Sequence, residues 1–140
     1  MDCANLLEWL NKDFPELRFR EGKKFAFRPP RTVIFEPITE VEAEYKIYSM
    51  RLLHEVGHAV LGHFDYRQDL GRVKMEREAW QKARELAERY GVEYDEEVAE
   101  GELESYREWL YQRSKCPKCG LARYQTRGGE WKCPGCNMGG

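Results

Sequence analysis

The sequence predicts an α+β fold, and three observations support this class. Apolar residues recur at helical spacing near the N-terminus and again in three long segments after residue 38. Residues 17–36 instead read as short strands. Four of the five cysteines lie in two pairs after residue 115. With 140 residues, the chain has room for one small domain, expected at 1–114, and an appended module at 115–140.

The N-terminal third is predicted to be one helix followed by three strands. Leucines at helical spacing predict a helix over residues 2–12, with Asp2 as its cap. Strands are expected at residues 17–20, 24–28 and 32–36. The first two alternate apolar and basic residues on either side of Glu21-Gly22. We therefore expect these two strands to pair as a hairpin.

Three further helices are predicted by apolar spacing, at about residues 39–63, 73–90 and 95–115. Thr39 and Glu42 have the spacing of a capping box at the start of the first. Gly91 is a common type of terminator for the second. Since strands are followed by helices rather than alternating with them, the order favours α+β.

The net charge of −2 is unevenly distributed. Residues 1–114 carry −6 and residues 115–140 carry +4, so the C-terminal module permits weak contact with nucleic acid or an acidic protein. The longest apolar runs have three residues, far fewer than a membrane span needs. The first residues lack the basic segment of a secretory signal. We therefore expect no membrane association and a cytoplasmic location.

Residues 54–58, HEVGH, form an HExxH motif. Residues i and i+4 lie one turn apart on a helix, so His54 and His58 can bind one Zn²⁺. Glu55 can hold a water molecule at that metal and act as general base. Gly57 costs helix stability and is expected to leave room near the metal. The motif predicts a catalytic zinc site.

Such a site needs a third protein ligand and one open position. His63 is nearest, but a metzincin would need histidine at position 64, which is Phe64. We expect His63 to lie beside the site without binding the metal. Glu76 and Glu78 open the next helix, and an antiparallel return of that helix would bring one of them to the histidines.

The run HEVGHAVLGH, followed by EREA at residues 76–79, resembles the gluzincin class of zinc peptidases, and within it the ImmA/IrrE-like group. The element order is also similar to that of the archaeal minigluzincins. The resemblance covers about residues 32–90 and implies His54 and His58 as ligands and Glu55 as base. It implies Glu78 as third ligand, because Glu78 and the alanine after it match the EA pair of that element.

Two details depart from related patterns. Trp80 stands where the gluzincin element usually has Asn or Asp. SprT-like proteases also combine HExxH with a C-terminal zinc ribbon, but their third ligand is a later histidine, and none follows His63. The architecture is therefore similar to SprT-like proteases, whereas the ligand set is similar to gluzincins.

The C-terminal module contains two CPxC motifs, whose cysteines are Cys116, Cys119, Cys133 and Cys136. Each CxxC turn directs amides at its sulfurs, and two turns complete a tetrahedral S₄ site. The module resembles a zinc ribbon, with rubredoxin-type iron as the alternative metal. A closed Cys₄ site is structural, and so small a module needs its metal to fold. The chain is thus expected to bind two zinc ions.

These features predict an intracellular zinc metalloendopeptidase that acts on a peptide or protein. The resemblance implies an edge strand that binds an extended substrate, and the strand at 32–36 is the candidate for it. An ordinary core strand is the alternative for this segment. Tyr66, Tyr94 and Tyr106 are the candidates for a donor to the transition-state oxyanion.

Two alternatives remain at this stage. The chain could be a DNA- or protein-binding regulator that uses the ribbon, where Arg123, Tyr124, Arg127 and Trp131 interleave charge with aromatic rings. The HExxH site would then be non-catalytic. In the other alternative, the ribbon covers the cleft and the chain is a self-inhibited, zymogen-like peptidase.

Overall fold

The computed structural model describes residues 3–136 and confirms the α+β class. The helices are α1 (Cys3–Asp13), α2 (Tyr45–Leu61), α3 (Asp69–Tyr90) and α4 (Glu96–Ser114), with a 3₁₀ turn η1 (Glu42–Glu44) before α2. The strands are β1 (Arg18–Glu21), β2 (Ala26–Arg28), β3 (Thr32–Phe35), β4 (Tyr124–Gln125) and β5 (Trp131–Lys132). The predicted cap Asp2 lies outside the described residues.

The three-stranded sheet has β3 at its centre, in the order β1-β3-β2. Val33 of β3 pairs with Phe19 of β1 in parallel and with Phe27 of β2 in antiparallel fashion. The predicted β1–β2 hairpin is therefore wrong. Of the two alternatives for residues 32–36, the structure shows the core strand and not the edge. The reason is burial: β3 is the most buried of the three strands, so it takes the position that is covered on both sides.

The helices match the predicted order with shifted starts. Helix α2 begins at Tyr45, after η1, rather than at Thr39. The Thr39 hydroxyl accepts from the Val41 amide and donates to Glu44 instead of forming a box with Glu42. Helix α3 begins at Asp69, four residues earlier than expected.

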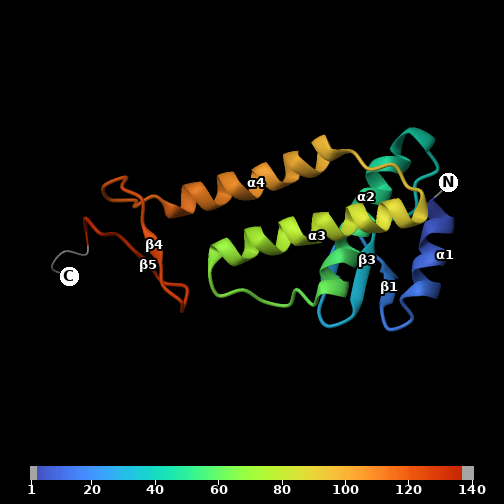
Figure 1. The fold of residues 1–140 in the computed structure, drawn as a ribbon, viewed down its shortest axis with the longest axis horizontal. Helices are drawn as coiled ribbons and strands as arrows, with labels where there is room; N and C mark the ends of the chain where they lie inside the picture. The colour runs from blue at the N-terminus through green and yellow to red at the C-terminus, as the bar shows by residue number, and fades with distance from the viewer. Residues whose placement is uncertain (1–2, 137–140) are drawn as a thin grey trace.

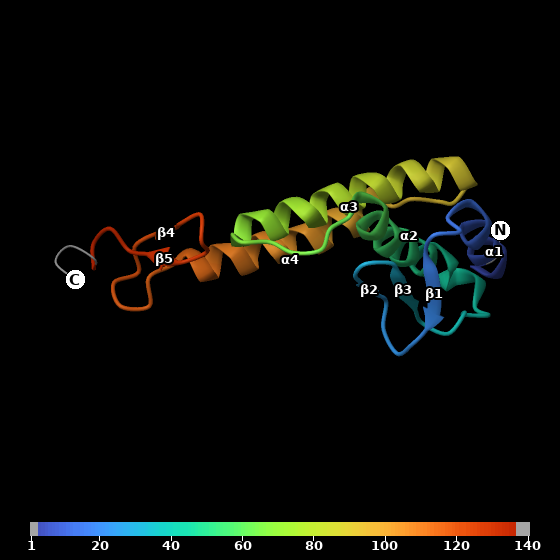
Figure 2. The same ribbon diagram turned by 90° about the horizontal axis from the view of Figure 1, so that it is seen from below.

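Helix α2 lies at the centre of the molecule, between the sheet and α3 (Figure 2). Its buried residues include Leu52, Leu53 and Val56, which belong to the same core as Leu6 of α1 and Val33 of β3. Burying this many aliphatic side chains fixes the rotation of α2 about its axis. The faces of α2 that carry polar residues are thereby fixed as well.

Helices α3 and α4 run side by side as a long antiparallel pair, and the strands β4 and β5 lie at the end of this pair that is remote from the sheet (Figure 1). Helix α3 ends at Gly91, which has φ 69°, as the sequence predicts. Helix α4 begins with a cap that was not predicted, since the Asp95 side chain accepts from the Glu97 amide. Within residues 3–136, no helix combines the length and apolar character needed to cross a membrane.

Candidate metal centre

Helix α2 carries the HExxH motif on its C-terminal half. His54 and His58 lie one turn apart, with ring centroids separated by 4.6 Å and side chains 12% and 10% exposed. Glu55 joins them, because one ligand atom from each of the three residues lies within 4.8 Å of the others. The three side chains could therefore contact one metal ion.

Helix α3 supplies a carboxylate that faces both imidazoles, and this residue is Glu76. Its Oε2 lies 2.8 Å from Nε2 of His54, and its Oε1 lies 3.1 Å from Nε2 of His58. Helical spacing explains this placement, since Glu76 shares a face with Ala79 and Ala83, which are buried against the rest of the core. The antiparallel return predicted from the sequence thus brings a glutamate to the histidines.

Glu78 lies elsewhere. Its Oε1 is 3.5 Å from Nε2 of His63, and its side chain is 40% exposed. Two residues correspond to about 200° around an α-helix, so Glu78 cannot share the direction of Glu76. The resemblance implied Glu78 as the residue at the imidazole pair, whereas the structure places Glu76 there.

His63 connects Glu78 to the centre. Nδ1 of His63 lies 3.0 Å from Nδ1 of His58. If Nε2 of His58 held a metal, the proton of that ring would lie on Nδ1 and would be donated to Nδ1 of His63, and the Nε2–H of His63 would then face Glu78. The three residues form a chain that fixes the orientation of the His58 ring, and His63 lies beside the site as expected.

Nε2 of His54 and Oε2 of Glu76 are both buried and lie 2.8 Å apart, but they do not meet in hydrogen-bond geometry and neither has another hydrogen-bond partner. Such atoms are uncommon in folded proteins because leaving them unpaired is costly. Ligands that bind Zn²⁺ at about 2.0–2.1 Å in a tetrahedron stand roughly 3.3 Å apart, close to the separations here. Two imidazoles and one carboxylate at these separations could therefore hold a zinc ion.

The charges of the cluster favour a cation. Burial, the largest influence on Glu76, opposes its ionisation, but His54 and His58 outweigh it and lower the pKa to about 2. Burial likewise opposes a charge on His54, whereas Glu55 and Glu76 raise its pKa to about 9. At neutral pH the carboxylate of Glu76 is ionised and His54 carries a proton, so a metal ion at this ring would take the place of that proton.

Two contacts hold α3 against α2 at this point. A Cβ on Gly57 would lie 2.6 Å from the carbonyl oxygen of Ala79, so only glycine permits this approach of the helices. Trp80 stacks on the His54 ring, with centroids 4.3 Å apart and planes at 13°. Gly57 thus makes room for helix α3 rather than for the metal. Trp80 orients the His54 ring by stacking on it instead of by hydrogen bonding.

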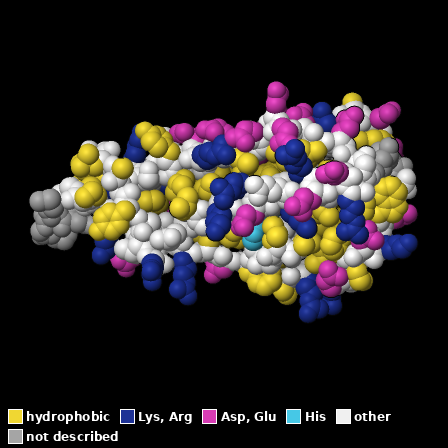
Figure 3. Space-filling view, in the orientation of Figure 1, with side chains coloured by type: hydrophobic (Ala, Val, Ile, Leu, Met, Phe, Trp, Pro, Cys, Tyr) yellow, Lys and Arg dark blue, Asp and Glu magenta, His cyan; other side chains and the backbone are white. Residues whose placement is uncertain are grey.

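A cavity of about 410 Å³ opens beside the centre. It is lined by Lys24, Phe25, Glu36, Arg51, His54, Glu55, Trp80, Glu102 and Tyr106. Its walls are the residues just before β2 on one side and α4 on the other, with an Arg51–Glu102 ion pair of 3.7 Å between α2 and α4. Part of the histidine cluster reaches the molecular surface (Figure 3). None of these lining residues belongs to the ribbon. The cavity therefore gives no support to the alternative in which the ribbon covers the cleft.

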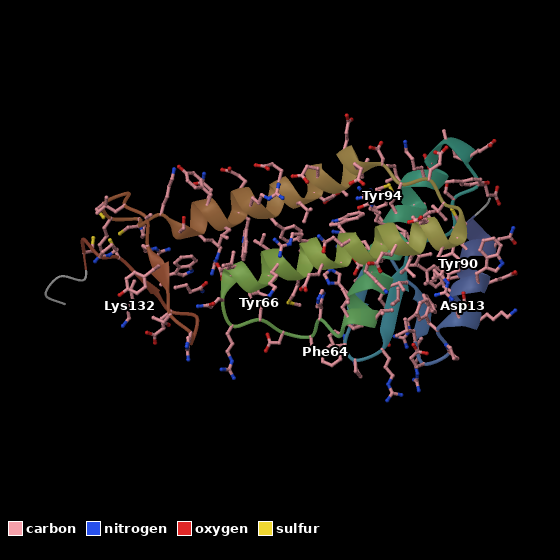
Figure 4. All side chains as sticks on the ribbon, in the orientation of Figure 1. Asp13, Phe64, Tyr66, Tyr90, Tyr94 and Lys132 are labelled. Atoms are coloured by element: carbon pink, nitrogen blue, oxygen red, sulfur yellow. The ribbon has the colours of Figure 1, made fainter. Side chains whose placement is uncertain are left out.

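Only one of the three candidate tyrosines lines this cavity, and it is Tyr106. Burial, followed by the charge of Glu76, raises the pKa of Tyr106, which keeps its hydroxyl protonated as a donor. The Tyr94 hydroxyl donates to the carbonyl of Trp80 at 3.2 Å and is thus engaged. Tyr66 lies near the start of α3 (Figure 4).

The sheet edge nearest the cavity is β2, not β3. Lys24 and Phe25, which lead into β2, line the cavity, and β2 pairs with β3 along one side only. The other side of β2 carries backbone groups that no strand in residues 3–136 pairs with. An extended segment could therefore add to the sheet at β2.

The four C-terminal cysteines form a second cluster. Sγ of Cys116 lies 3.6 Å from Sγ of Cys136, and Sγ of Cys119 lies 3.5 Å from Sγ of Cys133. Sulfurs bound to zinc at about 2.3 Å stand roughly 3.8 Å apart. Amides of Cys119 and Lys118 lower the pKa of the Cys116 thiol to about 6, which favours a thiolate. The predicted S₄ geometry is present and can hold a metal ion.

The ribbon is attached to the start of α3 by hydrogen bonds. The side chain of Gln125 accepts from the Asp69 amide at 2.6 Å, and the side chain of Gln68 donates to the carbonyls of Gln125 and Thr126. The buried Asp69 carboxylate also binds Arg113 of α4. No side chain within α3 caps its first turn, so Gln125 of the ribbon supplies the cap.

Sequence reasoning did not single out Arg72 or Gln125. The guanidinium of Arg72 lies 5.2 Å from the ring centroid of Tyr106, next to the cavity. A signal for Arg72 does exist: it precedes Glu76 by four residues and so shares its helix face. Nothing in the sequence around Gln125 indicates that it caps a helix more than fifty residues away.

Comparisons with protein-family models, with curated proteins and with solved structures found no match. The function of the centre is therefore inferred from its own residues.

Proposed function

We propose that the chain is a zinc-dependent peptidase in which His54, His58 and Glu76 hold the metal and Glu55 is the general base. The observation that carries this proposal is the placement of both Glu76 oxygens within 3.1 Å of the two Nε2 atoms. Two of these atoms are buried without a hydrogen bond. This donor set, with one open position, is typical of catalytic rather than structural zinc.

Zinc held there would act as a Lewis acid and lower the pKa of a water molecule at its open position. Glu55 lines the cavity next to His54. Its carboxylate can accept a proton from the attacking water and deliver it to the amine of the cleaved peptide bond. Tyr106, on the opposite wall, can donate to the oxygen of the carbonyl under attack.

The substrate in this proposal is an extended peptide. Its backbone would pair with the free side of β2 and pass along the cavity between β2 and α4. Strand addition recognises the backbone first, so the cleavage preference would depend on the side chains that line the cavity. Apart from Glu55, the charged side chains that line the cavity are those of Lys24, Glu36, Arg51 and Glu102.

The test is the full-length Glu55→Gln variant. It should retain two zinc ions per chain and lose cleavage of a mixed peptide library by at least about a hundredfold, because the proton acceptor is removed while the ligands stay. Glu88→Gln, which removes an exposed glutamate of α3 that does not line the cavity, is the matched control and should keep the cleavage of the parent. Equal cleavage by Glu55→Gln and the parent would exclude Glu55 as the base.

The regulatory alternative uses the ribbon alone. Tyr124 and Leu121 are more than half exposed on the ribbon, whereas Trp131 lies under the guanidinium of Arg123. DNA binding that persists in His54→Ala, together with no cleavage of any library peptide by the parent, would favour that function over the peptidase.

A further inference from the structure

Arg72 is held by three aromatic rings. Its guanidinium carbon lies 4.7 Å from the ring centroid of Trp109, 5.2 Å from that of Tyr106 and 5.9 Å from that of Tyr66. These rings come from α4 and from the loop between α2 and α3. A guanidinium fixed by ring faces loses little conformational freedom when it binds a planar anion.

No acidic side chain in residues 3–136 forms an ion pair with Arg72. Its neighbours on α4 differ: Arg113 pairs with Asp69, and Arg107 pairs with Glu100 and Glu104. Arg72 is only half-buried, so its side chain is partly open to a ligand, and Tyr106 can use only part of the five N–H donors of the guanidinium. The strongest hydrogen bonds that such donors form are charge-assisted pairs with the two oxygens of one carboxylate.

The position of Arg72 relates it to the metal centre. It precedes Glu76 by one helical turn, so both side chains extend from the same face of α3. Tyr106, which contacts the guanidinium, also lines the cavity that contains His54 and Glu55. Arg72 thus lies behind one wall of the cavity, in contact with Tyr106 and one helical turn before Glu76.

We propose that Arg72 binds a carboxylate of the peptide substrate next to the metal centre, and that the enzyme therefore prefers peptides that carry an acid close to the cleaved bond. This inference rests on the proposed peptidase function. The carboxylate can be the free C-terminus of the peptide or an acidic side chain. The two sources present the same planar anion to the guanidinium.

The experiment measures peptide binding to the zinc-loaded, full-length Glu55→Gln protein by titration calorimetry, so that no cleavage occurs. Three forms of one peptide are compared: a free C-terminal carboxylate, a C-terminal amide, and an amide form with one internal Glu. At least one acidic form should bind about tenfold more tightly than the plain amide. The acidic form that is preferred identifies the source.

The preference should disappear when Arg72→Gln is added, whereas binding of the plain amide peptide stays unchanged. Arg77→Gln, which removes an exposed arginine of the same helix, is the matched control and should keep the preference. Arg72→Lys retains the charge and should keep part of it. Thermal unfolding shows whether Arg72→Gln destabilises the aromatic cluster. If it does, Arg72→Lys is the variant that tests the proposal.

Equal binding of all three peptides to the Glu55→Gln protein would overturn the proposal, as would a preference that survives in Arg72→Gln. A failure of the peptidase function is distinguishable, because it shows as one zinc per chain in the parent or as no cleavage by the parent. With two zinc ions per chain and active parent protein, equal binding would reject the role of Arg72 alone.

Discussion

At the residue scale, the two glutamates of the EREA segment occupy different environments. Glu76 faces both histidines, and Glu78 faces His63 from a more exposed position. Glu76→Gln should reduce the zinc content from two ions to one per chain, because it replaces an anionic ligand oxygen with a neutral amide. Metal analysis of the purified protein checks this, with the zinc of the Cys₄ cluster as an internal reference.

Glu78→Gln provides the control for this prediction. Its side chain lies outside the pair of imidazoles, so the zinc content should stay at two ions per chain. If Glu78→Gln loses one zinc ion while Glu76→Gln keeps both, the ligand implied by the gluzincin resemblance is correct and the assignment made from the geometry is wrong.

A second prediction concerns His63, which contacts Nδ1 of His58 at 3.0 Å. His63→Ala removes the acceptor that orients the His58 ring, and zinc affinity at the His54–His58 centre should fall by about ten- to a hundredfold. Competition with a fluorescent zinc chelator measures this affinity. His63→Gln offers an acceptor oxygen and should restore part of it. Unchanged affinity in His63→Ala would show that the contact does not support the centre.

The sequence already contained the information that selects Glu76 over Glu78 as the glutamate that faces the histidines, although the resemblance implied Glu78. Glu76 shares its helical register with Ala79 and Ala83, which are apolar and buried, whereas Glu78 shares its register with Lys82. A periodicity argument therefore selects Glu76. The motif match selected Glu78 because it compared letters along the chain and did not compare directions around the helix.

At the element scale, the approach of α2 and α3 depends on a glycine. A side chain at Gly57 would meet the backbone oxygen of Ala79, and a backbone atom cannot move aside as a flexible side chain can. Gly57→Ala should lower the free energy of unfolding by about 1–3 kcal/mol and weaken zinc binding, because α3 carries Glu76. Chemical denaturation and zinc titration measure the two effects.

Gly101 of α4 is the matched control, since nothing lies within 4 Å of the Cβ that alanine would add there. Gly101→Ala should raise the free energy of unfolding by up to about 1 kcal/mol through helix propensity alone. Stabilisation by both substitutions would mean that the helices do not pack as closely at Gly57 as the structure shows.

The sheet shows that local sequence patterns predict the positions of strands but not their pairing. The alternation and the turn residues predicted three strands near their true positions, because both are local properties. The pairing was wrong, because it depends on which strand can be covered on both sides. The apolar run at Thr32–Phe35 contained this information, since a strand without polar alternation is usually central.

At the scale of the whole molecule, the two metal clusters are connected through α3. The ribbon contributes the side chain of Gln125 to the first amide of this helix, and the helix carries Arg72 and Glu76 one and two turns further along. The sequence predicted both clusters separately, since each is a local motif. It could not predict the connection, which depends on a contact between residues 56 positions apart.

This connection makes a last prediction. Cys116→Ser should remove one zinc ion and unfold the ribbon, because the module has too little core to fold without metal. The cap on the Asp69 amide is then lost, and a lost cap destabilises a helix start by about 1 kcal/mol. Hydrogen exchange of amides 69–73 should accelerate by about fivefold, whereas exchange in the centre of α2 stays the same.

Gln125→Ala should reproduce the acceleration with both zinc ions in place, since it removes the cap and leaves the four cysteines intact. If exchange at 69–73 is unchanged in both variants, the ribbon does not support α3, and its contact with the rest of the chain has no bearing on the histidine centre.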